Sequence, residues 1–121
     1  MNSYQKGKFA EFIARWYMRL KGYSIISCNY VTGKGSNAGE IDFIAGKGKL
    51  LVFVEVKQRR NIKEAAYSIS SSQKQRIIRG AQSFLLHTPQ YRNFDMRFDC
   101  ILIKLPFKVM HIPNAWYCEI R

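Results

Sequence analysis

Two apolar runs, residues 39–45 and 50–57, are separated by a short turn that holds two glycines. Both runs are rich in Ile, Val and Phe, and a link of this length joins neighbouring antiparallel strands, so the stretch predicts a β-hairpin. Side chains alternate between the two faces of a strand. If the apolar faces of both strands turn to the same core, the opposite face gathers four charged residues: Glu40, Asp42, Glu55 and Lys57.

The pairing register of this hairpin has two alternatives. A turn centred on residues 47 and 48 places Glu40 opposite Glu55. A bulge at the glycines places Asp42 opposite Glu55. In both registers Asp42 and Glu55 are neighbours, because diagonal pairs in a sheet lie about 7–8 Å apart. Facing like charges destabilise a sheet, so a bound divalent cation such as Mg²⁺, which prefers oxygen ligands, is the simplest reason for the arrangement.

The net charge of the chain indicates the kind of molecule that it binds. The 121 residues fit one domain, 1–121, and carry a net charge of +12 from 20 Lys and Arg against 8 Asp and Glu. Such an imbalance predicts a polyanion, and the alternative is a generally basic protein without one. Three of the eight acids lie on the hairpin, and an acidic cluster on a basic body suits a metal site that acts on phosphate.

Several other classes are disfavoured. No apolar run approaches the ~20 residues that span a bilayer, and the N-terminus lacks the apolar stretch of a signal peptide, so we expect a cytoplasmic protein without membrane contact. With only two histidines, the widely spaced Cys28, Cys100 and Cys118 argue against a zinc site or a disulfide framework. Reduced, mostly buried thiols are expected instead.

The N-terminal segment, residues 3–21, predicts a helix that Gly22 ends. Helical spacing gives a buried stripe of large side chains: Phe9, Phe12, Ile13, Trp16 and Leu20. A second stripe has small side chains and Met: Gly7, Ala14 and Met18. We therefore expect the helix to be buried on two sides. Glu11 lies beside the second stripe. It is either a surface acid or a third carboxylate directed at the hairpin.

Downstream, the sequence predicts a strand at 23–30, the hairpin, a helix from an N-cap among residues 70–72 to about His87, and strands at 95–104 and 107–112. Residues 113–116 are interpreted as a tail. The order of helix, three strands, helix and two strands indicates an α/β or α+β domain. We expect a mixed central sheet flanked by the two helices, with the hairpin in its middle.

Basic and polar side chains near the hairpin are candidates for contacts with a nucleic-acid backbone. They are Lys34, Arg59, Arg60, Gln73, Lys74 and Arg76. Gln73 and Lys74 lie in the first turn of the second helix, where amide groups favour phosphate. The glycine-rich loop around Lys34 enters a strand and not a helix, which excludes a Walker-type phosphate loop.

The series Asp42, then Glu55-Val56-Lys57 on the next strand, resembles the core of the PD-(D/E)xK nuclease superfamily and is similar to that of archaeal Holliday-junction resolvases. The chain also resembles the YraN-like family of small bacterial proteins. That likeness extends over nearly the whole sequence, through Glu11, residues 39–42 and 52–57, Arg97-Phe98-Asp99 and residues 112–116. Gln58-Arg59 departs from the family pattern, and so does the absence of an arginine before Gly39.

The resemblance implies a restriction-endonuclease-like core and a metal-dependent endonuclease. Asp42, Glu55 and the main-chain carbonyl of Val56 would hold Mg²⁺ or Mn²⁺, and Glu11 would support the metal or complete a second site. Lys57 would position the attacking water or stabilise phosphate charge. The substrate would be nucleic acid, DNA and branched DNA foremost, and a homodimer is implied by the resolvases. Glu40 would be a spare ligand or the partner of an arginine. The alternative is a binding module on the same fold without catalysis.

Overall fold

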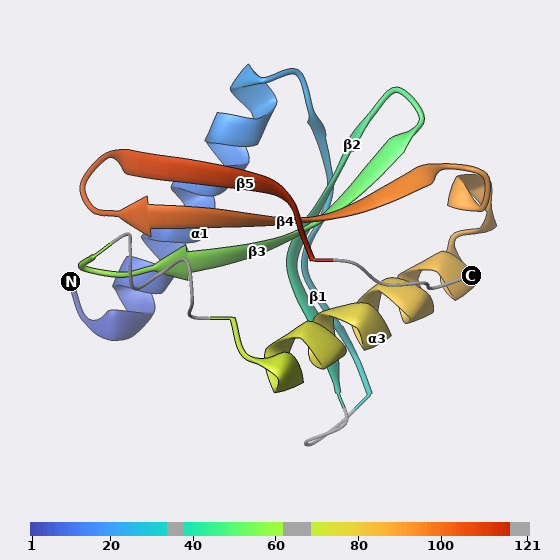
Figure 1. Ribbon diagram of the computed structural model, residues 1–121, viewed down its shortest axis with the longest axis horizontal. Helices are drawn as coiled ribbons and strands as arrows, with labels where there is room; N and C mark the ends of the chain where they lie inside the picture. Colours follow the sequence, from blue (N-terminus) through green and yellow to red (C-terminus); the bar gives the residue numbers. More distant parts are fainter. Residues whose placement is uncertain (34–37, 62–68, 117–121) are drawn as a thin grey trace.

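The computed structural model describes residues 1–33, 38–61 and 69–116. Two long helices and one five-stranded sheet make up the fold (Figure 1). In chain order the elements are α1 (Ser3–Leu20), β1 (Ser24–Thr32), β2 (Gly39–Lys47), β3 (Leu50–Gln58), α3 (Ser71–His87), the 3₁₀ helix η2 (Pro89–Tyr91), β4 (Asp95–Lys104) and β5 (Lys108–Trp116). The predicted order of elements and the α+β class are confirmed.

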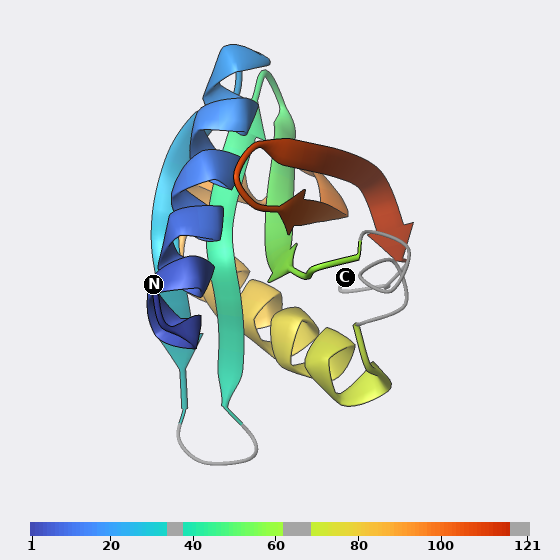
Figure 2. The ribbon, with the colours of Figure 1, turned by 90° about the vertical axis from the view of Figure 1, so that its left-hand side faces the viewer.

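The sheet follows the order β1-β2-β3-β4-β5 and is mixed. β3 and β4 pair in parallel, whereas the other neighbours are antiparallel. A parallel pair needs a long crossover, and the connection that contains α3 provides it. α1 lies behind the sheet and α3 in front of it (Figure 1). Figure 2 shows the twist of the sheet: in this view β2 runs nearly vertically, whereas β5 runs across the picture. The hairpin of β2 and β3 therefore lies in the middle of the sheet, as predicted.

Each face of the sheet has its own apolar core. On the α3 side the buried residues include Ile44, Leu51, Phe53, Ile77, Ala81 and Phe84. On the α1 side they include Ala10, Ala14, Met18, Phe43, Val52 and Val54. The sequence suggests one apolar face for the hairpin and a charged face opposite, on the condition that both strands turn their apolar sides to the same core. That was wrong, because helices cover both faces and the charged residues are confined to one end of the hairpin.

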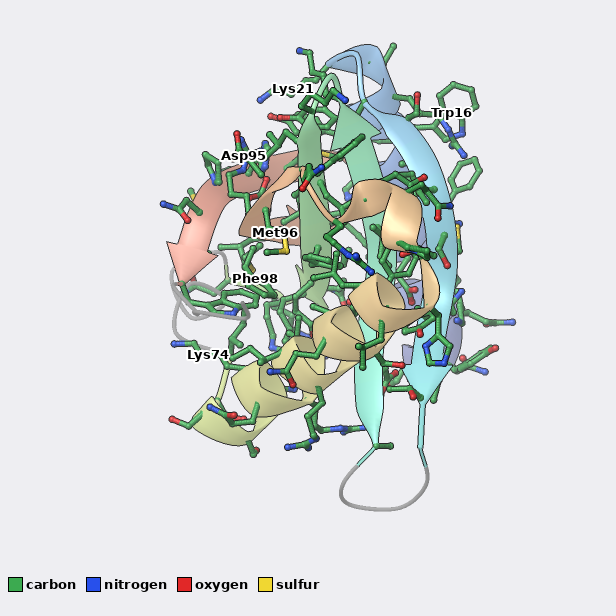
Figure 3. All side chains as sticks on the ribbon, turned by 90° about the vertical axis from the view of Figure 1, so that its right-hand side faces the viewer. Trp16, Lys21, Lys74, Asp95, Met96 and Phe98 are labelled. Atoms are coloured by element: carbon green, nitrogen blue, oxygen red, sulfur yellow. The ribbon has the colours of Figure 1, made fainter. Side chains whose placement is uncertain are left out.

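The large apolar stripe predicted as the buried face of α1 is in fact largely outward. Phe12 and Trp16 are each 49% exposed and Leu20 is 83% exposed. In Figure 3 the Trp16 side chain points away from the sheet. The buried line is Ala10, Ala14 and Met18. Small side chains let the helix backbone approach the sheet closely, and hydrophobic spacing alone does not reveal that requirement.

The helix termini follow their sequence signals. Asn2 and Gln5 form a capping box at the start of α1, and Ser70 with Gln73 forms one at the start of α3. Gly22 has φ +95°, and its N–H donates to the Arg19 carbonyl. Together with the bond from the Tyr23 N–H to the Met18 carbonyl, this is a Schellman motif that ends α1.

The last strand is longer than the sequence indicates. β5 runs from Lys108 to Trp116, so the residues interpreted as a tail continue the strand. Pro113 lies on an edge strand, where a missing N–H costs no ladder bond. The expectation for the thiols is only partly correct, because Cys100 is buried and Cys28 is exposed. Cys118 lies outside the described residues.

α3 touches β2 through two glycines. A Cβ added to Gly39 would lie 2.4 Å from the backbone nitrogen of Gly80 and 2.8 Å from its Cα. A Cβ added to Gly80 would lie 2.9 Å from the side chain of Ile41. Backbone therefore meets backbone at this crossing, with no side chain between.

None of the helices in the described parts of the chain is long and apolar enough to cross a membrane.

Candidate functional site

The turn of the hairpin decides which acids face each other. β2 and β3 pair without a register shift from Lys47–Leu50 to Phe43–Val54. Gly48, with φ +59°, and Lys49 form the turn. Extending the same register by one pair places Asp42 across from Glu55. The predicted turn centred on residues 47 and 48 was therefore wrong, and the Asp42–Glu55 register arises without the bulge that the alternative invoked.

A pocket of about 280 Å³ opens where this end of the hairpin meets the N-terminal halves of α1 and α3. Its lining comes from α1, β2, β3 and α3: Gly7, Ala10, Glu11, Glu40, Asp42, Glu55, Val56, Lys57, Gln58, Gln73, Arg76 and Ile77. The pocket thus brings together all the residues that the sequence analysis proposed for metal binding and catalysis. Lys74, Arg59 and Arg60 do not line it, and Lys34 lies outside the described residues.

Asp42 and Glu55 are largely buried carboxyl groups in mutual contact. The N–H of Val56 donates to Asp42 Oδ2 at 2.7 Å, and Lys57 Nζ lies 3.1 Å from Glu55 Oε1. Burial, and next the charge of Asp42, raises the pKa of Glu55 to about 8. Burial also raises the pKa of Asp42. Without a bound cation, the pair therefore shares a proton near neutral pH.

Glu11 belongs to the same pocket. Its side chain is 14% exposed, so it is not a fully solvated acid, although it keeps an ion pair with Lys8. Its Oε1 is buried and has no hydrogen-bond partner among the described residues, while Oε2 lies 3.8 Å from Lys8 Nζ. Burial, and next the charge of Asp42, raises the pKa of Glu11. A buried oxygen without a donor costs stability, and this oxygen can accept a hydrogen bond from a group that enters the pocket.

Glu40 and Arg76 form an ion pair of 2.8 Å at the rim. Both side chains are about half exposed, so the expectation of an arginine partner for Glu40 is correct. The Gln73 side chain accepts from the Ser70 N–H in the capping box. Arg76 and Gln73 thus line the pocket but already have partners within the protein.

Oxygen-rich lining fits a hard divalent cation. Two adjacent carboxylates with a nearby main-chain carbonyl and water are the kind of set that holds Mg²⁺. Across the described ranges, no three side chains of Asp, Glu, His or Cys are grouped closely enough to hold a metal ion by themselves. The set therefore fits a site of two carboxylates completed by water or phosphate, with the Glu11 oxygen nearby.

The sequence analysis missed a second polar centre around Asp99, which is fully buried. Its two oxygens accept from Arg97 Nε and the other guanidinium nitrogen at 2.7 Å, from His111 Nε2 at 2.7 Å and from the Asn114 N–H at 2.9 Å. Burial alone would raise the pKa of Asp99, but these hydrogen bonds lower it. The signal was present, since Arg97 and Asp99 occupy alternate positions and so share one face of β4.

The comparisons with known proteins agree with this architecture. The model of the "Uncharacterised protein family UPF0102" matches residues 10–103. The chain belongs to the UPF0102 family. A UPF0102 protein of Paramagnetospirillum magneticum is 42% identical over 93% of this chain and 87% of its own length. One from Rhodopseudomonas palustris strain HaA2 is 37% identical over 94% and 86%. The YraN-like resemblance is thereby confirmed.

Among solved structures, the chain resembles Hjc, a Holliday junction resolvase from Archaeoglobus fulgidus. The TM-score is 0.51 at 16% sequence identity, over 90% of this chain and 73% of the resolvase. At this identity the likeness concerns the fold. The UPF0102 chain therefore has the endonuclease-like fold that its sequence predicted.

Proposed function

We propose that this UPF0102 protein is a metal-dependent endonuclease that hydrolyses phosphodiester bonds of nucleic acid. The observation that carries the proposal is the convergence of Asp42, Glu55 and Lys57 on one pocket, with the unpartnered Glu11 oxygen beside them. A protein without chemistry at this place has little use for three partly buried carboxyl groups, since burial raises the pKa of each above its ordinary value. The resolvase-like fold is consistent with the proposal.

Asp42, Glu55 and the carbonyl of Val56 would hold Mg²⁺ or Mn²⁺. When bound, such an ion polarises the scissile phosphate and makes a bound water easier to ionise. The Val56 N–H fixes one oxygen of Asp42, so the carboxylate is oriented before any ligand arrives. Lys57, held by Glu55, would orient the attacking water or stabilise charge on the phosphate. Glu11 would accept a hydrogen bond from a water in the pocket.

The substrate follows from charge and from the fold. A net charge of +12 favours a polyanion, and we propose DNA, branched DNA in particular, because the structural neighbour is by its title a Holliday junction resolvase. Arg59, Arg60 and Lys74 lie outside the pocket and would contact the flanking backbone. A homodimer and a cytoplasmic location stay predictions.

The second candidate is a nucleic-acid-binding module without catalysis. The observation in its favour is that the acids already have basic partners, as in the Glu55–Lys57 and Glu40–Arg76 pairs. In that case the pocket would be an ion-pair network on a basic body. The two candidates differ in what happens when one charge is removed.

The decisive experiment compares wild type with Glu55→Gln and Lys57→Ala on linear duplex, single strand, flap, four-way junction and RNA, with Mn²⁺ present. Glu40→Gln is the matched control, because it removes the same charge from the rim of the same pocket. The nuclease proposal expects cleavage of at least one substrate. It also expects loss of cleavage with retained or tighter binding in Glu55→Gln, and loss of most cleavage with retained metal binding in Lys57→Ala.

Glu40→Gln should cut like wild type. If wild type binds the substrates but cuts none of them across metals and pH, the binding module is the better description. If Glu40→Gln and Glu55→Gln lose cleavage equally, the assignment of Glu55 as a ligand is wrong.

A further inference from the structure

A second pocket, of about 350 Å³, lies at the other end of α1. Its lining is Lys21, Tyr23, Lys47, Arg97, His111 and Pro113. Glu11 of the candidate active site and Lys21 are ten residues apart on and just beyond α1, which corresponds to roughly 15 Å of helix rise. Figure 3 shows Lys21 at one end of the molecule and Lys74, at the start of α3, toward the other. The second pocket is therefore separate from the site already described.

Basic groups from three strands and from the residue that follows α1 meet in this pocket, and none of its lining residues is acidic. The nearby carboxylate, Asp99, is fully buried beneath it and has both oxygens engaged by Arg97, His111 and the Asn114 N–H. Asp99 thus fixes the orientation of Arg97 and His111. The charges of Arg97 and Asp99 oppose each other, so Lys21 and Lys47 leave an excess of positive charge at the pocket.

The lysine ammonium groups contact a main-chain carbonyl, a histidine ring and aromatic rings. Lys47 Nζ donates to the Lys21 carbonyl at 2.9 Å, and Lys21 Nζ lies 3.4 Å from His111 Nδ1. They also lie over aromatic rings, Lys47 at 5.3 Å from the Tyr23 centroid and Lys21 at 4.8 Å from that of Tyr17. Within the described ranges, neither ammonium has a carboxylate oxygen within 4.0 Å.

The Tyr23 hydroxyl adds a donor. Its oxygen accepts from Arg97 at 2.9 Å, which leaves its own hydrogen for another acceptor. A structural role alone would explain Lys47, since a cation beside the last carbonyls of a helix is favourable. It does not explain why Lys21, Arg97 and His111 line the same pocket, whose lining holds no acid. A bound anion would balance this excess of basic groups.

We propose that this pocket binds a phosphate group. The donors are the ammonium groups of Lys21 and Lys47 and the hydroxyl of Tyr23, with Arg97 fixed behind them by Asp99. The phosphate belongs either to a free phosphate monoester or to the backbone of a nucleic acid, which would then be held about 15 Å from the candidate active site. Binding at this pocket requires neither Asp42 nor Glu55.

The test is a titration of metal-free, ¹⁵N-labelled protein followed by NMR, with isothermal calorimetry for the dissociation constant. The ligands are inorganic phosphate, a nucleoside 5′-monophosphate and a short DNA duplex. The variants are Lys21→Gln and Lys47→Gln, each checked for unchanged thermal unfolding. Lys49→Gln is the matched control, because it removes the same charge two residues from Lys47 while its ammonium lies over Phe94, outside the pocket.

We expect the amide signals of Tyr23, Arg97 and His111 to shift on titration. Each pocket variant should weaken binding about tenfold, as for the loss of one charge-assisted hydrogen bond, and Lys49→Gln should weaken it less than twofold. Saturation by inorganic phosphate or the monophosphate identifies a free phosphate monoester. Saturation by the duplex alone identifies the nucleic-acid backbone.

Equal weakening in Lys49→Gln and the pocket variants would overturn the proposal, because it would reduce the effect to general surface charge. Shifts that avoid Tyr23 and His111 would overturn it as well. The same titrations on Asp42→Ala protein separate the two sites. Phosphate binding should persist there even if no nuclease activity exists, and nuclease activity should persist in wild type even if this pocket binds nothing.

Discussion

Replacing Glu55 by glutamine should stabilise the metal-free protein at alkaline pH. Burial, and next the charge of Asp42, raises the pKa of Glu55 from 4.5 to about 8. The unfolded chain releases that proton at the ordinary pKa, so unfolding releases a proton between about pH 4.5 and 8. The stability of the wild type therefore falls as the pH rises through this window. Glutamine keeps the shape without the charge and removes this dependence.

The size of the effect follows from the pKa. Each pH unit of the window corresponds to about 1.4 kcal/mol, so the interval from 4.5 to about 8 sets an upper limit of about 5 kcal/mol. The Glu55 side chain is 13% exposed and shares its proton with Asp42, both of which reduce the value. We expect the variant to gain about 2–4 kcal/mol on the wild type between pH 5 and pH 9, or about 3–5 °C in Tm per kcal/mol.

The assay is thermal unfolding by circular dichroism in EDTA, at intervals from pH 5 to pH 9. Glu40→Gln is again the matched control. Its ion pair with Arg76 is about half exposed, so the change should cost less than about 1 kcal/mol. A difference between Glu55→Gln and wild type that does not change with pH would refute the reasoning, because it would mean that Glu55 is ionised in the folded protein throughout.

Four further outcomes are expected. Asp99→Asn should cost about 3–5 kcal/mol in urea unfolding, because it leaves buried donors unpaired, and the wild type should lose stability as the pH falls through the lowered pKa of Asp99. Leu20→Ala should cost under about 1 kcal/mol, whereas Ala14→Leu should cost about 1–3 kcal/mol by overpacking. DNA affinity should fall steeply between 50 and 200 mM salt in a filter-binding assay. Sedimentation should give a dimer mass, and a monomer at all concentrations would contradict the homodimer.

Much of the fold could be predicted because its signals are local. Turn glycines, capping serines and runs of β-branched residues report on their own neighbourhood, and they located α3, β2, β3 and β4 closely. The burial of α1 was predicted only in part, because it depends on what lies opposite: the stripe with Ala14 and Met18 is buried, and the stripe with Trp16 is largely exposed. Trp16 and Ala14 are both compatible with a helix, and only the closeness of the sheet decides that alanine is the buried residue.

The candidate site could be predicted from Asp42, Glu55 and Lys57 because they are near in sequence and share one hairpin. The burial of Glu11 in the same pocket could not be predicted, because it depends on how α1 crosses the end of that hairpin. The polar centre around Asp99 was not predicted for a similar reason. Its partners come from two strands. The pairing of β4 with β5, which brings His111 to Asp99, cannot be predicted from the sequence of either strand alone.

The glycine contact between β2 and α3 has a consequence for how such a pocket changes over time. Because the main chains of Gly39 and Gly80 touch, the distance between the hairpin and the helix is fixed by the backbone itself. Lining side chains such as Gln73 and Arg76 can then be exchanged without altering the width of the opening. A lineage could alter what the pocket recognises by single substitutions along α3 and keep the same aperture throughout. The two glycines themselves leave no such latitude.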